Sequence, residues 1–331
     1  GPPPERDTPM PRRRALLATP LLALPVAARA QGAWPSRPVR IVVAYPPGGS
    51  TDVLARTLAA ALQDAFPGSG FVVENRAGGA AVVGTGAVAQ AAPDGYTLAL
   101  GNNQTHAANA AMLRGLPFDP VADFAPVARL ATVYHALVVP ATSPARTLAD
   151  LTARARAGRV SYASSGVGSA SHVIAETFVR RDGIEATHVP YRGGGPATTD
   201  TVAGVVDYFV STWPQVVALV REGRLRALGI GAPARLPETP EVPTFAELGR
   251  PDLAVEAWFG MWAPARTPPD IVARLAEALT RILADRAMVE RLNGQGFVAA
   301  PQGPADFAAF QRAEVARWRA LVELTGIRIE G

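Results

Sequence analysis

The stretch IVVAYPPGGSTDVLAR, residues 41–56, places two prolines and two glycines between an apolar run and a helix-like pattern. The continuous apolar run predicts a buried strand over residues 39–44, and the three- and four-residue spacing that follows predicts a helix over residues 52–65. The turn between them has two interpretations. It is a capped turn, in which glycine supplies positive φ and Ser, Thr or Asp caps the helix, or it is a backbone cradle whose free N–H groups bind an anion.

Strand-like and helix-like segments alternate along the rest of the chain, which has 331 residues, 48% of them apolar. This alternation indicates βαβ units, so we expect an α/β fold with mainly parallel sheets flanked by helices. The expected strands span residues 39–44, 71–73, 97–100, 127–130, 136–139, 160–163, 187–189, 208–210, 225–230 and 256–261. The expected helices span residues 52–65, 81–90, 148–157, 171–181, 197–203, 214–222, 269–284 and 304–324.

Two proline-rich segments, residues 139–144 and 236–243, divide this pattern. They bracket a block of about one hundred residues, which is a common size for a domain. We expect a discontinuous first domain, residues 31–138 and 245–331, and a second domain, residues 139–244. Two chain crossings between domains create a cleft that suits a ligand trapped by closure.

The first thirty residues have the pattern of an export signal. The basic cluster Arg12–Arg14 precedes an apolar stretch over residues 15–27, and Ala28-Arg29-Ala30 fits a cleavage site. The apolar stretch is shorter than the about 20 residues that span a bilayer, so we expect a mature protein that is free in the periplasm after cleavage near Ala30. The general secretory and twin-arginine routes both remain open. Residues 1–9 precede Met10 and are either native or an N-terminal extension.

Composition excludes several kinds of chemistry. The chain has no Cys, which rules out disulfides, thiolate nucleophiles and cysteine-based metal sites. No two of its four histidines have metal-ligand spacing, and all 32 basic residues are Arg, so a lysine-containing phosphate loop is absent. GTGAVA, residues 84–89, fits GxGxxA but lacks the preceding strand and the following acid of a dinucleotide site. We therefore expect no metal and no cofactor.

The formal net charge of +4 does not indicate a nucleic-acid partner. Five arginines and two acidic residues lie in residues 1–30, so the rest of the chain is close to neutral. We expect no binding to nucleic acid.

Three further strand exits resemble the first turn: SYASSGVGSASH at residues 161–172, HVPYRGGGPA at 188–197 and GNNQTHAAN at 101–109. For each turn by itself, a capped turn is the simpler interpretation. Four such turns favour a ligand site, because the carboxyl ends of the strands of an open α/β sheet lie at one edge, where ligands bind. The turns offer neutral N–H and O–H donors. We therefore expect a small carboxylate ligand and no catalytic group.

The candidate ligand-binding residues come from these turns and from the strand exit FVSTWPQ, residues 209–215. They are Tyr45, Pro47, Gly48, Gly49, Ser50, Thr51, Asn102, Thr105, His106, Ser164, Gly166, Gly168, Ser169, His172, Tyr191, Gly193, Gly194, Ser211 and Trp213.

Several candidates have a structural alternative. Tyr45 and Tyr191 place a phenol at the cleft or pack on their loops. His106 and His172 donate to a carboxylate or cap and pack locally. Trp213 lines the pocket or packs on the helix that follows it.

Four neighbouring residues are assigned other roles. Asp52 caps or charges the first turn of its helix, because its carboxylate would repel an anion. Arg192 pairs with a second carboxylate or remains solvated. His135 and His188 lie next to apolar strands and are expected to be structural.

The ordered motifs of the chain resemble those of the solute receptors of tripartite tricarboxylate transporters, the Bug/TctC family. The resemblance covers residues 34–324 and is carried by RPVRIVVAYPPGGSTDVLAR, VVENRAGGA, PDGYTLALG, DFAPVARL, VSYASSGVGSASH, THVPYRGGGPA, GRLRALGI, PEVPTFAELG and WFGMWAPARTP. It implies a two-domain periplasmic-binding-protein (Venus flytrap) fold and a receptor that delivers a small carboxylate to a membrane permease. We expect the receptor to be a monomer. It also implies that the ligand lies between residues 45–51 and the second-domain loops 164–169 and 191–195, partly through ordered water.

One departure from the family bears on the ligand. Where the family often has Phe-Asp-Asn before Leu-Pro, this chain has Val210-Ser211-Thr212 before Trp213-Pro214. The family's aspartate suits an ammonium group, so Ser211 argues against amino acids. We expect a di- or tricarboxylate, or an aromatic acid stacked on Trp213.

The function expected from these observations is binding and domain closure without catalysis. Two alternatives are a receptor that signals to a sensor kinase, and a periplasmic enzyme that uses His106 or His172 as a base. The enzyme is disfavoured, because no activated nucleophile or metal set accompanies either histidine.

Overall fold

The computed structural model describes residues 1–2, 4, 34–325 and 328 of the chain. It consists of two units, Gly1–Ala33 and Trp34–Gly331, and every helix and strand named below belongs to the second unit. The arginine cluster, apolar stretch and cleavage site of the expected export signal lie outside the described residues. Within the described part, no helix has the length and apolar character needed to cross a membrane.

A mixed sheet of ten strands forms the centre of the second unit, in the order β2-β1-β3-β9-β4-β7-β5-β6, with β8 and β10 each paired to β4. The pairs β1–β2, β1–β3, β5–β6 and β5–β7 are parallel, whereas β4 and β9 run antiparallel to their neighbours. The strands are β1 (Val39–Val43), β2 (Phe71–Asn75), β3 (Thr97–Asn102), β4 (Phe124–Pro140), β5 (Val160–Ser164), β6 (Ala186–Pro190), β7 (Tyr208–Thr212), β8 (Leu225–Ile230), β9 (Glu256–Pro264) and β10 (Val298–Gln302). The predicted α/β class is confirmed.

Strand β4 is shared by two halves of the sheet. Its residues up to Tyr134 pair with β9 and β10, and its residues from His135 onward pair with β7 and β8. We call the strands on the β9 side, with their helices, the first half, and the strands on the β7 side, with theirs, the second half. The sequence predicted two strands, residues 127–130 and 136–139, but β4 is one strand of 17 residues. Its middle contains Thr132, Val133 and Tyr134, which favour strands and pair with β9.

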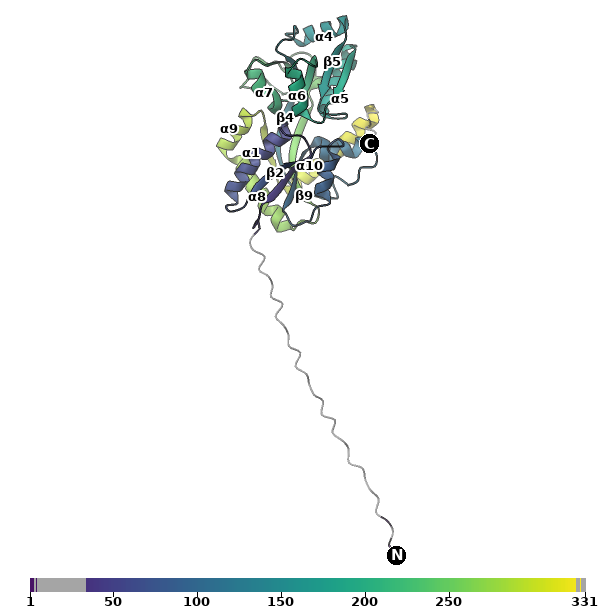
Figure 1. Cartoon of the computed structure of the whole chain (residues 1–331), viewed down its shortest axis with the longest axis vertical. Helices are drawn as coiled ribbons and strands as arrows, with labels where there is room; N and C mark the ends of the chain where they lie inside the picture. The colour runs from purple at the N-terminus through teal and green to yellow at the C-terminus, as the bar shows by residue number, and fades with distance from the viewer. Residues whose placement is uncertain (3, 5–33, 326–327, 329–331) are drawn as a thin grey trace. The chain divides into compact units, whose positions relative to one another are not determined.

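Helices cover the sheet in both halves. They are α1 (Ser50–Ala65), α2 (Val82–Ala89), α3 (Asn109–Met112), α4 (Leu148–Ala157), α5 (Ala170–Asp182), α6 (Gly194–Val202), α7 (Trp213–Arg221), α8 (Pro269–Ala284), α9 (Arg286–Gly294) and α10 (Pro304–Thr325), with a π-helix at Gln104–Ala108 and a 3-10 helix at Pro251–Leu253. In Figure 1, helices α4 to α7 lie near β5 in the second half, and α1, α8 and α9 lie in the first half.

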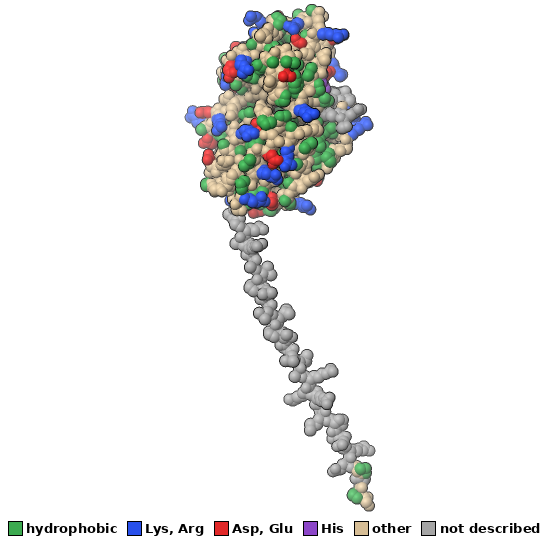
Figure 2. All heavy atoms as spheres, viewed as in Figure 1, with side chains coloured by type: hydrophobic (Ala, Val, Ile, Leu, Met, Phe, Trp, Pro, Cys, Tyr) green, Lys and Arg blue, Asp and Glu red, His purple; other side chains and the backbone are tan. Residues whose placement is uncertain are grey.

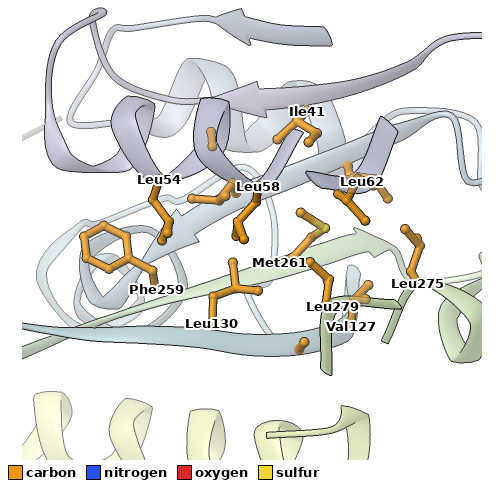
Figure 3. Packing of buried hydrophobic residues seen from close by; sticks show 14 of the residues in the cluster. Ile41, Leu54, Leu58, Leu62, Val127, Leu130, Phe259, Met261, Leu275 and Leu279 are labelled. Carbon is orange, nitrogen blue, oxygen red and sulfur yellow. The ribbon is translucent and has the colours of Figure 1, made fainter. Parts of the chain in front are cut away.

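The core of the first half forms where α1 and α8 pack on β1, β4 and β9. Figure 3 shows Leu54, Leu58 and Leu62 of α1 near Phe259 and Met261 of β9. The three leucines are four residues apart, so they share one face of the helix. Each of them is 0% exposed, and full burial of one such side chain stabilises the fold by roughly 2 kcal/mol. Helix α1 is therefore held firmly, and so is its N-terminus.

Four segments were not predicted from the sequence: the π-helix with α3, the 3-10 helix at Pro251–Leu253, α9 and β10. The polar turn after β3 was expected to be a loop. It continues as a π-helix because Asn102 Oδ1 accepts hydrogen bonds from the backbone N–H groups of Gln104, at 3.0 Å, and Thr105, at 3.3 Å. These bonds start the helix within the turn. The sequence has no apolar periodicity there that would predict a helix.

The surface carries charges of both signs. Arg37 pairs with Asp94 at 2.9 Å and Arg281 with Glu277 at 3.0 Å, and Figure 2 shows basic and acidic side chains interspersed over the face it presents. Exposed pairs of this kind contribute little to stability. The buried cores on the two halves of the sheet hold the fold.

Candidate ligand-binding site

A small cavity of about 60 Å³ lies where β1, β3, β5 and β7 end, between the two halves. Its lining consists of Tyr45, Gly49, Ser50, Thr51, Asn102, Asn103, Gln104, His135, Ser165, Ser169, Ala170, Ser171, Gly194, Phe209, Val210, Ser211, Thr212, Gln215, Ala257 and Phe259. None of these residues carries a full charge at neutral pH, because the one titratable base, His135, is neutral, as shown below. The cavity therefore offers hydrogen-bonding groups and apolar surface, but no ion-pair partner.

Four helices begin at this cavity. Helices α1, α5, α6 and α7 start at Ser50, Ala170, Gly194 and Trp213. The N-cap residues of α1, α6 and α7 make no side-chain cap hydrogen bond, and only α5 is capped, by Ser169, whose hydroxyl accepts from the His172 N–H. Unpaired N–H groups at a helix start, together with the aligned peptide dipoles, favour a negatively charged ligand. The cavity is electrostatically suited to an anion although it lacks a cation.

The loop between β1 and α1 meets the start of α6. A methyl group added at Gly195 would lie 2.9 Å from Pro47 O, and one added at Gly193 would lie 2.8 Å from Pro46 Cδ. Gly193 also has a φ of 138°, a backbone angle that other residues rarely adopt. The glycines of the RGGG turn therefore allow the two halves to approach at the cavity. Thr212 adds a direct bond across this contact, since its Oγ1 donates to Ser50 Oγ at 3.0 Å.

Asp52 supports the same loop from the first turn of α1. Its carboxylate accepts from the Gly48 N–H at 3.1 Å, from Arg56 Nε at 3.0 Å and from Asn75 Nδ2 at 2.9 Å. Burial by itself would raise the pKa of the Asp52 carboxyl, but these hydrogen bonds outweigh it and hold that pKa below its usual value. Asp52 does not line the cavity. Its negative charge is used to fix the loop, as expected for a residue in the first turn of the helix.

Tyr45 orients two carboxamides in the cavity wall. Its hydroxyl lies 3.0 Å from Asn102 Oδ1 and 3.1 Å from Gln104 Oε1. Burial raises the pKa of Tyr45 well above its usual value, so the group is a neutral donor. Because both amide oxygens face Tyr45, the NH₂ groups of Asn102 and Gln104 are left to donate to a ligand.

His135 lies in the cavity wall, although the sequence interpretation treated it as structural. Its ring Nδ1 is 3.1 Å from the carbonyl oxygen of Val255. Burial lowers the pKa of His135 to about 4, against the small opposing effect of that hydrogen bond, so the ring is neutral at physiological pH. His188 does take a structural role, because its Nε2 bonds Ser164 Oγ at 2.6 Å behind the turn that follows β5.

Eight of the predicted site residues line the cavity: Tyr45, Gly49, Ser50, Thr51, Asn102, Ser169, Gly194 and Ser211. Two more, Gly166 and Tyr191, line an adjoining hollow of about 440 Å³ that also has Tyr45 and Arg192 in its wall. Tyr191 is fixed there by a hydrogen bond from its hydroxyl to Asp200 Oδ2 at 2.7 Å. The four predicted turns therefore do converge on one place.

His106 and Trp213 require a correction, because both side chains are completely buried and line neither space. The His106 ring stacks on Trp262 with 3.5 Å between centroids, and burial lowers the pKa of His106 to about 3. Its neighbour Thr105 also lies outside the lining, since its hydroxyl bonds the His106 ring at 2.8 Å. Trp213 packs in the core of the second half, against Gly296. Trp213 therefore offers no face on which an aromatic acid could stack.

Six other predicted residues shape the turns from behind and do not line either space: Pro47, Gly48, Ser164, Gly168, His172 and Gly193. His172 Nδ1 accepts from the Gly168 N–H at 3.1 Å, and the His172 ring stacks on His188 with 4.0 Å between centroids. These contacts set the shape of the glycine turn. These six residues support the turns. Their positions in glycine-rich turns do not reveal, from the sequence alone, whether a residue supports the turn or contacts the ligand.

Twelve lining residues were not predicted: Asn103, Gln104, His135, Ser165, Ala170, Ser171, Phe209, Val210, Thr212, Gln215, Ala257 and Phe259. Most lie next to a predicted residue in the same turn. Gln215 follows the predicted strand exit, and its side-chain NH₂ donates to Gly194 O and Thr198 Oγ1, which ties α7 to α6. Ala257 and Phe259 come from the antiparallel strand β9, and no sequence signal places them at the site.

The fold and this cavity define a two-domain α/β binding protein of the periplasmic-binding-protein type. The chain belongs to the tripartite tricarboxylate transporter receptor family, whose family model matches residues 54–327. Over 320 residues it is 38% identical to the protein BugT of Bordetella pertussis, covering 95% of this chain and 96% of BugT. The expected family membership and fold class are both confirmed.

Solved structures agree with this assignment. Rpa4515 of R. palustris, solved with adipate, is 34% identical with a TM-score of 0.85, and the match covers 89% of this chain and 99% of that one. MatC (Rpa3494) from Rhodopseudomonas palustris, with bound malate, is 33% identical with a TM-score of 0.79, covering 87% and 100%. The periplasmic binding protein BugD is 28% identical with a TM-score of 0.83, covering 90% and 100%.

Proposed function

We propose that this protein is a periplasmic receptor that captures a small carboxylate between its two domains and delivers it to the membrane permease of a tripartite tricarboxylate transporter. The observation that carries the proposal is the convergence of four helix N-termini on a cavity without a charged side chain. Adipate and malate in the structures of related proteins support the carboxylate class. The receptor acts by binding the ligand and closing around it, and no covalent bond is made or broken.

A carboxylate has two oxygens that together accept about four hydrogen bonds. The cavity supplies hydroxyl donors from Ser50 and Thr51 and N–H donors from the helix starts. Hydrogen bonds to a charged acceptor are roughly twice as strong as neutral ones. Fixed donors of this kind replace the ligand's water shell when the cleft closes, so affinity does not depend on a buried arginine.

Closure between the domains follows from how the chain crosses between them. It crosses first within β4, where pairing changes from β9 to β7 between Tyr134 and His135. For the return crossing we expected residue 245, but Phe245 and Leu253 pack in the core of the second half. We therefore assign residues 34–134 and about 255–325 to the first domain. Bending at these two crossings would open the contact between the RGGG turn and the loop after β1.

The lining also bears on which carboxylate is bound. No acidic side chain lines the cavity, and the position at which the family often has aspartate is Ser211, which is 1% exposed. An ammonium group would have no anionic partner there, and the positive ends of the helix dipoles would oppose it. The receptor is therefore selective for di- or tricarboxylates over amino acids. Burial of Trp213 removes the expected support for an aromatic acid.

An enzymatic role has little support. The candidate bases were His106 and His172, and neither lines the cavity. His106 is sealed in the core, and the Nδ1 of His172 is occupied by the Gly168 N–H. A receptor that signals to a sensor kinase would use the same cavity. This alternative differs from the transport receptor in its protein partner and not in its ligand.

A thermal-shift screen at pH 7 tests the ligand class. Succinate, malate, adipate and citrate are compared with aspartate, glutamate, benzoate and glucose. We expect di- or tricarboxylates to raise the melting temperature, since a ligand at 100 times its Kd stabilises the folded state by about 2.7 kcal/mol. Stabilisation by glucose alone, or by aspartate as strongly as by succinate, would contradict the proposal.

A further inference from the structure

The side chain of His135 has an unusual position for a buried histidine. It lies on β4 opposite Thr212 of β7, at the point where β4 passes from the first half to the second. The residue is 2% exposed and yet lines the cavity. A polar ring on the floor of a ligand cavity is placed to contact the ligand.

The hydrogen bond to Val255 fixes which ring nitrogen carries the proton. A carbonyl oxygen can only accept, so Nδ1 donates to Val255 O over the 3.1 Å between them. In a neutral imidazole, Nε2 is then an acceptor. No described residue makes a hydrogen bond to Nε2. This atom is also not one of the fully buried polar atoms that lack a partner, so it is accessible from the cavity. The Nε2 lone pair is therefore free to accept from a ligand.

The charged groups around His135 are already engaged. On β4 and β9, Arg129 pairs with Glu256 at 2.9 Å, and on α1 the Asp52 carboxylate is held by Arg56. The titratable neighbours Tyr45 and Tyr134 both have their pKa raised, chiefly by burial, and are neutral. None of these groups makes a hydrogen bond with the His135 ring in the structure, and no charge nearby favours its protonation.

Three chemical groups on a ligand could face Nε2, and two of them fit poorly. A second carboxylate has no hydrogen to donate and would confront the lone pair of the neutral ring. An ammonium group would donate, but four helix N-termini oppose its charge. An alcohol donates a hydrogen and carries no charge, so it satisfies Nε2 without either conflict.

We propose that His135 recognises a hydroxyl group on the ligand through Nε2, so that the receptor prefers a hydroxycarboxylate to the same acid without the hydroxyl. This inference rests on the proposed function, because it concerns the same cavity. Asn102 Oδ1 already accepts hydrogen bonds from the backbone N–H groups of Gln104 and Thr105, so it does not compete for the ligand's donor. When the plain acid binds, Nε2 is left buried without a donor. A site of this kind discriminates by about tenfold to a hundredfold.

Calorimetric titration of matched pairs at pH 7 tests this preference. Malate and succinate, and citrate and tricarballylate, differ by a single hydroxyl group. The wild-type protein should bind the hydroxy acid of at least one pair at least tenfold more tightly than its partner. His135→Phe keeps a ring of similar size without an acceptor, and it should bind both members of that pair about equally.

A second variant and a second readout separate recognition from general damage. His135→Gln places a carboxamide oxygen in the same region and should recover part of the preference. The binding enthalpy of the wild-type protein should be the same in phosphate and in Tris, whose ionisation heats differ. Equal enthalpies mean that no proton is taken up on binding, as expected if His135 stays neutral. Uptake of about one proton would overturn the inference, since it would mean that the His135 ring becomes protonated and pairs with a carboxylate of the ligand.

The failures of the two proposals are distinguishable. If plain and hydroxy acids bind the wild-type protein equally in every pair, the role of His135 is wrong and the carboxylate receptor stands. If no carboxylate binds at all, the proposed function is wrong and this inference falls with it.

Discussion

Replacing Ser211 by Asp should reverse the charge preference of the cavity. Ser211 lies on β7 opposite Ala136, is 1% exposed and lines the cavity, which has no charged side chain. For a separation of about 5 Å between an ionised carboxylate here and a carboxylate of the ligand, and an effective dielectric constant of about 20, the repulsion is about 3 kcal/mol. That energy corresponds to a more than hundredfold loss of affinity. The same charge would provide the missing partner for an ammonium group.

The assay is isothermal titration with succinate, malate and aspartate, and Ser211→Asn is the control because it has nearly the same shape as Asp without its charge. Burial raises the pKa of an introduced carboxyl, so repulsion should grow as the pH rises from 5 to 8 in Ser211→Asp and not in Ser211→Asn. We expect succinate and malate to weaken more than a hundredfold at pH 8 in the Asp variant only, and aspartate to gain affinity. Equal losses in both variants would show that the shape of position 211, and not its charge, controls binding, and the neutral-cavity reasoning would be refuted.

Three further predictions concern residues of the cavity wall and of the core beside it. Tyr45→Phe removes the donor that orients two carboxamides, so carboxylate affinity measured by calorimetry should fall about tenfold; an unchanged affinity would mean that Asn102 and Gln104 do not depend on it. Trp213→Ala should lower the free energy of unfolding by about 3–5 kcal/mol in urea titrations while the affinity of the folded protein stays within about threefold, because Trp213 is in the core and outside the cavity; a large loss of affinity without loss of stability would return it to the site. The buried rings of His106 and His135 have pKa values of about 3 and about 4, mainly because burial disfavours their charged forms. As the pH falls, these histidines are protonated in the unfolded chain before they are protonated in the folded protein. The stability that the neutral rings contribute above about pH 6.5 should therefore be lost as the pH falls from 6.5 towards 4, by up to about 1.4 kcal/mol per pH unit and ring. Urea titrations of wild type and His106→Phe should show a shallower pH dependence of the free energy of unfolding in the variant.

The place of the site could be predicted from the sequence, because it depends on local patterns. Glycine, serine and threonine at the end of an apolar run mark a strand exit, and parallel strands bring such exits to one edge of the sheet. Ser50, Ser169 and Gly194 were found in this way, and all three line the cavity.

The direction of each side chain could not be predicted in the same way. His106 and Trp213 lie beside predicted turns, but helix geometry turns both rings into the core. His135 gave the opposite error, because it is surrounded by strand residues and reaches the cavity only where β4 changes partners. Phe259 belongs to β9, whose antiparallel place beside β4 depends on long-range pairing that leaves no local signal.

The most direct measurement of the central claim is a crystal structure of the protein with the carboxylate that stabilises it most. We predict that the carboxylate oxygens accept hydrogen bonds from N–H groups at the starts of α1 and of at least one of α5, α6 and α7, directly or through one ordered water, with no arginine in contact. A ligand held by an arginine, or lying away from these helix starts, would contradict the account.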